Sequence, residues 1–174
     1  MLIRLAVREN VAAVMALLRQ VVPLMQAAGN LQWDERYPDE AVFELDVVRK
    51  QLWVAEVDGV IAGMAAVTTE PELEYAQVGW DIEEPAVMVH RLAVDPAFRG
   101  AGIAALMMRK AEEVATERGI SIVRTDTSAE NATAQRLFSK LRYELAGEIG
   151  LSFRPGLRVL CYEKRLNQAQ FHSM

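Results

Sequence analysis

Residues 87–106 decide the fold and read Val87-Met-Val-His-Arg-Leu-Ala-Val-Asp-Pro-Ala-Phe-Arg-Gly-Ala-Gly-Ile-Ala-Ala-Leu106. The apolar first part predicts a strand over Ala86 to Val94, which Asp95-Pro96 ends. From Ile103 onward, apolar residues recur at helical spacing and predict an amphipathic helix that stops at Arg118-Gly119. A strand therefore passes through a glycine-bearing turn directly into a long helix.

The turn between this strand and this helix can bind an anion. The first turn of a helix has amides without helical acceptors, and it is the positive end of the helix dipole. Gly100, Ala101, Gly102 and Ala104 keep the side chains short, so a phosphate or pyrophosphate can approach the backbone.

A dinucleotide site is one alternative for this turn. Gly100-Ala-Gly-Ile-Ala-Ala105 formally matches the dinucleotide fingerprint, and Asp126 follows at a plausible distance. That fingerprint places glycine immediately after the strand, whereas Asp95 to Arg99 intervene here. A dinucleotide domain also needs further βαβ units, but the preceding strands are linked as a hairpin. The nucleoside triphosphate loop is absent because no Gly-Lys-Ser/Thr occurs.

Apolar periodicity places the other elements around this stretch. Asp58-Gly59 between two apolar runs indicates a hairpin, and the strand–helix–strand unit from Ala86 to Asp126 must be a right-handed crossover. The remaining predicted strands are Leu2 to Val7, Gln51 to Val57, Val60 to Thr68, Ile120 to Asp126, Tyr143 to Ile149 and Arg158 to Lys164. The remaining predicted helices are Glu9 to Gln26 with a bend or break at Pro23, Pro38 to Arg49 with Pro38 in its first turn, and Asn131 to Lys140. Ala27 to Tyr37 is predicted to be a loop, and Glu70 to Glu84 mainly a connection. The order predicts a mixed α/β fold.

Composition limits the other possibilities. The chain has 174 residues, of which 52 % are hydrophobic and 25 % charged, as expected for one domain over residues 1–166 with a frayed polar tail at 167–174. A net charge of −5 without a basic stripe argues against nucleic acid. No apolar run approaches the ~20 residues of a membrane span, and the early charges exclude a signal peptide. The single cysteine allows no internal disulfide, so we expect a cytoplasmic protein without a membrane partner or a metal.

Three motifs together resemble one known family. Arg99-Gly-Ala-Gly-Ile-Ala104 resembles the Arg/Gln-x-x-Gly-x-Gly/Ala signature of the GNAT superfamily of acyl-CoA-dependent N-acyltransferases. Leu92-Ala-Val-Asp-Pro96 resembles the strand end before that signature, and Asn131-Ala-Thr-Ala134-Gln-Arg-Leu137-Phe138 resembles the later Asn-x-x-Ala-x-x-Leu-Tyr/Phe helix. The resemblance implies a mixed, mostly antiparallel sheet of about seven strands with about four flanking helices and one splayed strand pair.

A largely uncharacterised bacterial subgroup of this family is similar to the chain at further positions. These are Gln32-Trp33…Tyr37-Pro38, His90-Arg-Leu-Ala-Val94, Thr125-Asp126-Thr127 and Cys161-Tyr-Glu-Lys164. The resemblance supports the fold and the cofactor and says little about the substrate.

The resemblance implies transfer of an acetyl group from acetyl-CoA to a primary amine. The amine, on a small molecule or less commonly a peptide or protein, attacks the thioester directly. Pantetheine would bond to the strand backbone, and the Leu92 amide would polarise the carbonyl. The implied cofactor-binding residues are Leu92, Ala93, Val94, Arg99, Gly100, Ala101, Gly102, Ile103, Ala104, Asn131, Ala134 and Phe138.

Phe138 departs from the family pattern, in which many members have tyrosine. That tyrosine donates a proton to the departing thiolate, and phenylalanine cannot. Water, Tyr143 or Ser139 could replace it. A non-catalytic acetyl-CoA-binding or sensor protein on the same fold is therefore an alternative function.

The acceptor side has tentative candidates only. His90, two residues before Leu92, could be the general base, or it could be a hydrogen-bonded structural histidine. Asp126 could orient His90, bind an ammonium group, or cap the following turn. Trp33 and Tyr37 could line the acceptor pocket or anchor their loop in the core. Asn131 could contact the cofactor or only cap its helix; Cys161 is expected to pack inertly, and a homodimer is possible.

Overall fold

The computed structural model describes residues 1–167. Of the predicted tail, only Asn167 lies among these residues, and it is exposed; residues 168–174 lie outside them. The strands are β1 (Leu2–Leu5), β2 (Leu52–Val57), β3 (Val60–Thr68), β4 (Val87–Val94), β5 (Ile122–Ser128), β6 (Glu144–Leu151) and β7 (Arg154–Arg165). The α-helices are α1 (Val11–Ala27), α2 (Glu40–Val48), α3 (Ile103–Glu117) and α4 (Ala132–Lys140), and the short 3₁₀ helices are η1 (Arg8–Asn10), η2 (Leu73–Val78) and η3 (Pro96–Phe98).

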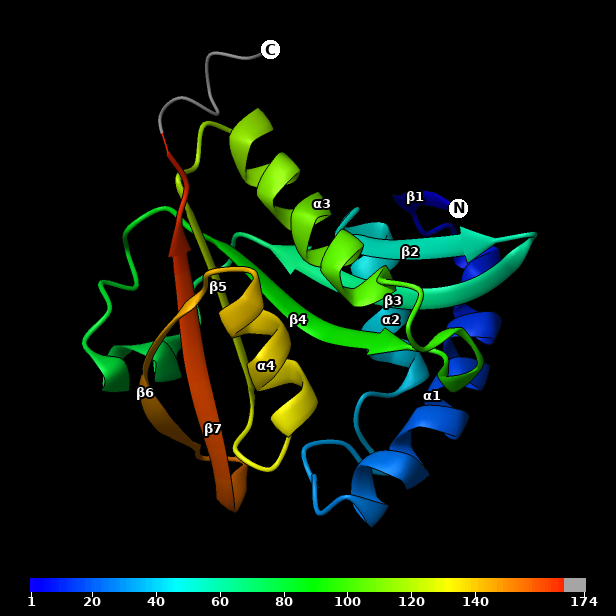
Figure 1. Cartoon of the computed structure of the whole chain (residues 1–174), viewed down its shortest axis with the longest axis horizontal. Coiled ribbons are helices and arrows are strands. Elements are labelled where there is room, and N and C mark those ends of the chain that lie inside the picture. Colours follow the sequence, from blue (N-terminus) through cyan, green and yellow to red (C-terminus); the bar gives the residue numbers. More distant parts are fainter. Residues whose placement is uncertain (168–174) are drawn as a thin grey trace. The chain divides into compact units, whose positions relative to one another are not determined.

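The strands form one open sheet in the order β1-β2-β3-β4-β5-β7-β6 (Figure 1). Strands β4 and β5 are parallel, whereas β1–β2, β2–β3, β5–β7 and β6–β7 are antiparallel. The predicted seven-stranded mixed α/β fold is confirmed. The chain divides into two compact units, a first unit of Met1–Val67 with His90–Lys110 and a second unit of Thr68–Val89 with the chain from Ala111.

The first unit has a hairpin with helices on both of its faces. Leu52 and Val54 of β2 lie in the core with residues of α1 and with Phe43 of α2. Trp53 points to the opposite face, where Lys110 of α3 lies 5.3 Å above its ring. The period-two alternation of the strand thus separates α2 from the start of α3, as Figure 1 shows. Asp58 and Gly59 both have positive φ, as a tight two-residue hairpin turn requires.

The second unit is built around β5 and β7. Asp126 of β5 lies opposite Cys161 of β7 in the antiparallel register. The parallel pairing with the start of β4 runs from Val87↔Val123 to Val89↔Thr125. The core on one face comprises Tyr75, Ala86, Met88, Ile122, Ile149, Val159 and Cys161.

Two local predictions are wrong in detail, and a third gains a short helix. The predicted break at Pro23 is wrong, because Pro23 lies inside α1 and apolar residues on both sides of it, among them Leu18 and Met25, pack against the same core; a bend there stays a prediction. Pro38 precedes α2 instead of starting it, since Asp39 is the N-cap and its Oδ1 accepts a hydrogen bond from Val42 N at 3.0 Å. The predicted connection over residues 70–84 contains η2.

The segment Arg8–Ala27 corrects the expectation about apolar runs. It has 20 residues, and an 18-residue window within it has a mean hydropathy of 1.3, so by length and composition alone this helix could cross a membrane. Core helices of soluble proteins pass the same test, and Val14, Leu17 and Leu18 of α1 are buried in the first unit's core. These buried residues pack with Leu52 and Val54 of β2, while 28 % of the window is buried in all. The cytoplasmic location stays a prediction.

Candidate functional site

The turn from β4 into α3 has the backbone geometry of an anion-binding loop. Asp95 Oδ1 accepts from Ala97 N at 2.9 Å and holds η3 directly after the strand. The first helical hydrogen bond of α3 runs from Leu106 N to Gly102 O at 3.1 Å. The amides of Ile103 and Ala104 therefore precede the first helical donor, and they lie at the positive end of the helix dipole.

Gly100 and Gly102 give this turn its shape and its open side. Their φ values are 85° and 76°, a region that residues with a Cβ rarely adopt. A Cβ built at either glycine would meet no atom within 4 Å. Residues 99–102 are exposed, so the space beside these peptides is open. The residues predicted to hold a diphosphate are thus brought together, and their chemistry fits that group.

The close approach of α3 to the sheet fixes where the turn lies within the first unit. Ile103 is 1 % exposed. A Cβ added to Gly63 of β3 would lie 2.7 Å from Ile103 Cγ2 and 3.3 Å from Ala93 O. A glycine in β3 therefore lets the first residue of the helix pack directly on the sheet.

A left-handed residue interrupts β4 just before the predicted catalytic amide. Arg91 has a φ of 53°, so the strict alternation of side chains does not hold between His90 and Leu92. The register with β5 runs only as far as Val89, whereas β4 continues to Val94. The predicted role of the Leu92 amide stays a prediction, and so does a splayed strand pair.

His90 has an environment that weakens it as a base. Its Nε2 is shielded from solvent. Burial and, after it, the charge of Arg91 lower the pKa of His90 from 6.5 to about 4, although the charge of Asp46 opposes both. The ring is therefore neutral at pH 7, but it accepts a proton from an ammonium group only weakly. The structure favours the alternative of a structural histidine.

Trp33 and Tyr37 point into the first unit. Trp33 is 6 % exposed within the core. Tyr37 packs against the same core and its hydroxyl accepts from Arg91 Nη1 at 3.2 Å. Both side chains thus anchor their loop in the core, which is one of the two roles that the sequence left open for them beside an acceptor pocket.

In the second unit, Asp126 pairs with a residue that the sequence did not single out. Tyr75 of η2 donates a hydrogen bond to Asp126 Oδ2 at 2.6 Å. Burial, followed by the charge of Asp126, raises the pKa of Tyr75 well above its usual range. Burial also raises the pKa of the Cys161 thiol, which agrees with inert packing. In the sequence, the only indication of a role for Tyr75 was that an aromatic residue lies in a segment predicted to be mainly a connection.

Both predicted cofactor residues of α4, Asn131 at its N-cap and Phe138 near its end, have structural roles in the protein itself. Asn131 Oδ1 accepts from Ala134 N at 3.1 Å, so the predicted helix cap is confirmed. Phe138 is 2 % exposed, and its ring centroid lies 6.1 Å from that of Tyr143 and 5.3 Å from that of Tyr162.

Tyr143 is a poor replacement for the family's acidic tyrosine. Its hydroxyl donates to Glu112 Oε1 at 3.0 Å, and Lys164 Nζ binds the same oxygen at 2.8 Å. Burial, followed by the charge of Glu112, raises the pKa of Tyr143 far above its usual value. The phenolic proton is therefore held within the protein and is a weak acid toward a thiolate.

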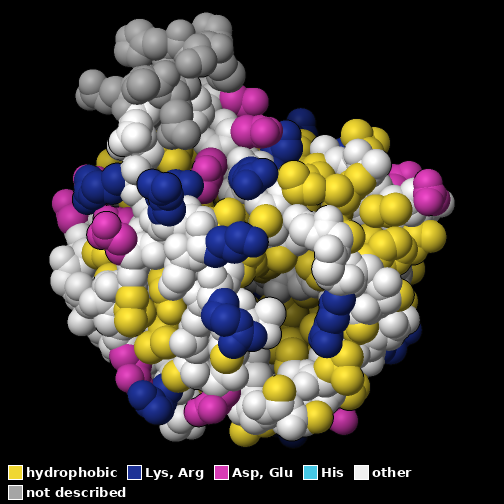
Figure 2. Space-filling model, in the orientation of Figure 1, with side chains coloured by type: hydrophobic (Ala, Val, Ile, Leu, Met, Phe, Trp, Pro, Cys, Tyr) yellow, Lys and Arg dark blue, Asp and Glu magenta, His cyan; other side chains and the backbone are white. Residues whose placement is uncertain are grey.

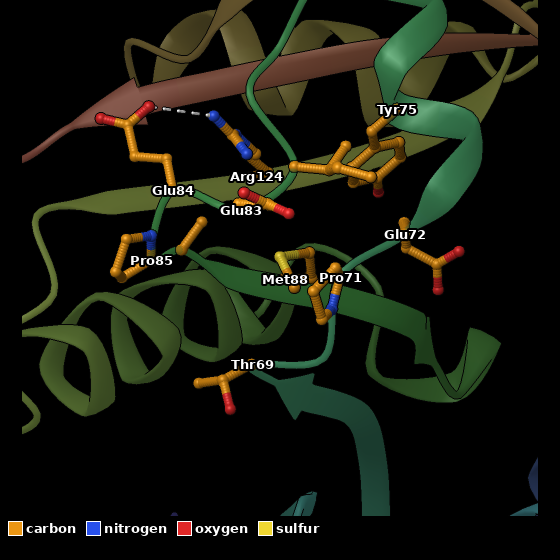
Figure 3. A pocket seen from close by; sticks show the side chains of 11 residues that line it. Thr69, Pro71, Glu72, Tyr75, Glu83, Glu84, Pro85, Met88 and Arg124 are labelled. Carbon is orange, nitrogen blue, oxygen red and sulfur yellow. Dashed lines mark ion pairs between the residues drawn. The ribbon is translucent and has the colours of Figure 1, made fainter.

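The second unit also contains a cavity of about 60 Å³, which Figure 3 shows. Glu72, Tyr75, Glu83 and Met88 line it, together with Arg124. Arg124 is 2 % exposed; it donates to Glu163 Oε2 at 2.9 Å, pairs with Glu84, and lies 4.8 Å over the Trp80 ring. Its charge is thus engaged within the protein.

Acidic and basic side chains both occur on the face drawn in Figure 2. Among residues 1–167, no group of three or more His, Cys, Asp or Glu side chains could hold a metal ion. The protein is thus an α/β protein with an open mixed sheet. Its strand β4 passes through two left-handed glycines into a helix whose first side chain is buried, and this turn can bind a phosphorylated cofactor.

A model of the acetyltransferase (GNAT) family matches residues 18–143, and the chain belongs to this family. Its members are acyl-CoA-dependent transferases, which confirms the predicted enzyme class. A solved GNAT-family acetyltransferase from Streptococcus agalactiae is 28 % identical, with a TM-score of 0.82 over 95 % of each chain. An acetyltransferase structure from Salmonella typhimurium, described with its cofactor acetyl-CoA, has the same fold at 20 % identity, with a TM-score of 0.70 over 96 % of this chain and 94 % of that one.

The N-acetylaspartate synthetase of Homo sapiens is 29 % identical over 120 residues. This match covers 69 % of the present chain and 36 % of the human protein. The chain thus corresponds to only part of the length of that relative.

Proposed function

We propose that this protein transfers an acetyl group from acetyl-CoA to the primary amine of a small molecule by direct attack. The observation that carries the proposal is the exposed turn with Gly100 and Gly102 at the start of α3. Arg99 is exposed beside it. The backbone of residues 99–104 would hold the cofactor diphosphate, with Arg99 supplying a positive charge.

The reaction needs one donor at the thioester and two proton transfers. The amine nitrogen forms a bond to the thioester carbon, and the tetrahedral oxyanion would accept a hydrogen bond from Leu92 N–H. One aimed donor of this kind is worth about 3 kcal/mol of transition-state stabilisation. The oxyanion then collapses, the carbon–sulfur bond breaks, and coenzyme A leaves as a thiolate.

Both proton transfers are proposed to use water: the amine loses its proton to water, and the thiolate takes one from water. A pKa of about 4 makes His90 a weak base, so the amine would enter in its neutral form or lose its proton to solvent. Phe138 has no hydroxyl and Tyr143 is bonded to Glu112. A thiolate with a free pKa of about 8.5 is a good leaving group that water can protonate. The rate should therefore rise with pH as more of the acceptor is neutral.

The acceptor is proposed to be a small amine of the amino-acid type. The name of the human relative, N-acetylaspartate synthetase, supports a small acceptor with a primary amine. Thiol release from acetyl-CoA should be measured with L-aspartate, other free amino acids, a polyamine and a peptide with a free N-terminus. Turnover with a free amino acid supports the proposal, and turnover with the peptide alone contradicts the acceptor class.

A non-catalytic acetyl-CoA-binding protein is the second candidate. The buried Phe138, where an acidic tyrosine is common in the family, favours it. Such a protein would bind acetyl-CoA in calorimetry and release no thiol with any amine of the panel.

A further inference from the structure

The left-handed backbone at Arg91 lies one residue before the amide that is proposed to polarise the thioester. A φ of 53° is unfavourable for an arginine. Such a conformation persists only where the surrounding structure over-determines it. The arginine side chain itself supplies contacts that can do so.

All three nitrogens of the Arg91 guanidinium donate hydrogen bonds, to two partner residues. Its Nε and Nη2 donate to the two carboxylate oxygens of Asp46 at 3.0 and 2.8 Å. Its Nη1 donates to the Tyr37 hydroxyl at 3.2 Å. The side chains of Arg91 and Asp46 are 13 % and 3 % exposed. A two-pronged contact of this kind fixes the orientation of the guanidinium as well as its position.

Both partners of Arg91 are themselves immobilised. Asp46 Oδ1 also accepts from Gln51 Nε2 at 2.7 Å, and Gln51 N donates to Asp46 O at 3.0 Å. Tyr37 belongs to a closed turn in which its N–H donates to Asp34 Oδ1 at 3.1 Å, while Asp34 N donates to Tyr37 O at 3.0 Å. The guanidinium is thus attached to a helix and a turn that have hydrogen bonds of their own.

We infer that Arg91 is a positioning residue for acyl transfer: its contacts with Asp46 and Tyr37 hold the left-handed backbone that aims the Leu92 N–H. This inference rests on the proposed function, since it takes that amide as the oxyanion donor. Stability alone is a weak reason for such a pair, because buried ion pairs often contribute little compared with apolar packing. The fork of arginine also matters, because lysine would keep the charge and lose the two-pronged contact.

The test compares Arg91→Lys and Asp46→Asn with a matched pair in the same unit. Arg4 and Glu56 form an ion pair at 2.8 Å between β1 and β2, and neither residue belongs to the proposed site. In the Arg91 and Asp46 variants we expect kcat to fall by about ten- to a hundredfold, with KM for acetyl-CoA within about threefold of the wild type. Arg4→Lys and Glu56→Gln should leave kcat unchanged.

A spectroscopic readout separates this inference from turnover. The infrared carbonyl band of acetyl-CoA, labelled at its carbonyl carbon, should shift to lower frequency on binding to the wild type. The shift should shrink in Arg91→Lys and Asp46→Asn and persist in the Arg4 and Glu56 variants. Absence of turnover in the wild type would refute the proposed function. The shift of the carbonyl band would still test whether Arg91 directs the Leu92 N–H toward the thioester carbonyl.

Folded Arg91→Lys or Asp46→Asn proteins with wild-type kcat and an unchanged carbonyl shift would overturn the inference. Loss of folding in both variants would assign the pair to stability and would overturn it equally.

Discussion

Replacing Gly102 by aspartate isolates the contribution of the helix start to cofactor binding. At a φ of 76°, an L-residue costs about 1–2 kcal/mol relative to glycine. A Cβ there meets no atom within 4 Å, so no clash adds to this cost. For a chain of this size the melting temperature should fall by roughly 2–8 °C, and the protein should stay folded.

The same substitution places a carboxylate beside the proposed diphosphate site. Two like unit charges about 5 Å apart repel by about 3 kcal/mol at an effective dielectric constant of about 20. The Kd for acetyl-CoA should therefore rise by about two orders of magnitude. Calorimetric titration gives this Kd directly, and thermal unfolding reports the cost of the backbone strain.

Gly59→Asp is the matched control. Gly59 has a φ of 79° and open space around its Cβ position, in the hairpin turn of the same unit. We expect a similar loss of stability and an unchanged Kd. Wild-type affinity for acetyl-CoA in folded Gly102→Asp would refute the assignment of the diphosphate to this turn.

Three further predictions concern packing, protonation and pH. Gly63→Ala places a methyl group 2.7 Å from Ile103 Cγ2, so the free energy of unfolding measured with denaturant should fall by about 1–3 kcal/mol and the Kd for acetyl-CoA should rise. Gly150→Ala is the control, because a Cβ there meets no atom within 4 Å. Equal effects of the two substitutions would contradict the close packing at Gly63. Phe138→Tyr should leave kcat within about twofold, because a thiolate of low pKa leaves without a proton, and a tenfold faster steady-state rate would show that protonation is limiting. Burial and the charge of Arg91 hold the pKa of His90 at about 4 instead of 6.5, so the unfolded chain binds an extra proton between these pH values. The contribution of the neutral ring to stability, about 3 kcal/mol, is therefore present above pH 6.5 and lost as the pH falls toward 4. His90→Asn should flatten this part of the pH profile of unfolding, whereas an identical slope would refute the prediction.

The fold could be predicted because its signals are local. The Asp58-Gly59 turn, the helical spacing after Ile103 and the Asn131 cap each depend on residues within a few positions of one another. The misplaced details have tertiary causes. Pro23 does not end α1 because core contacts continue beyond it, and packing of this kind overrides local propensity.

The candidate site was only partly predictable for the same reason. Residue types alone indicated a glycine-bearing turn at 99–104 that can bind an anion, and in the structure residues 99–102 are exposed. The partners of Arg91 are 45 and 54 positions away in sequence, and that of Asp126 is 51 away. No periodicity carries such pairings. The weak basicity of His90 likewise depends on burial and on Arg91, which a sequence pattern does not reveal.

The most direct test of the diphosphate site follows the backbone amides of Gly100, Gly102, Ile103 and Ala104 by nuclear magnetic resonance during a titration with acetyl-CoA. We expect these amides to show the largest shifts, and we expect the diphosphate-free analogue acetyl-pantetheine to leave them almost unmoved. Saturable binding of acetyl-CoA with these four amides unshifted would contradict the proposed site.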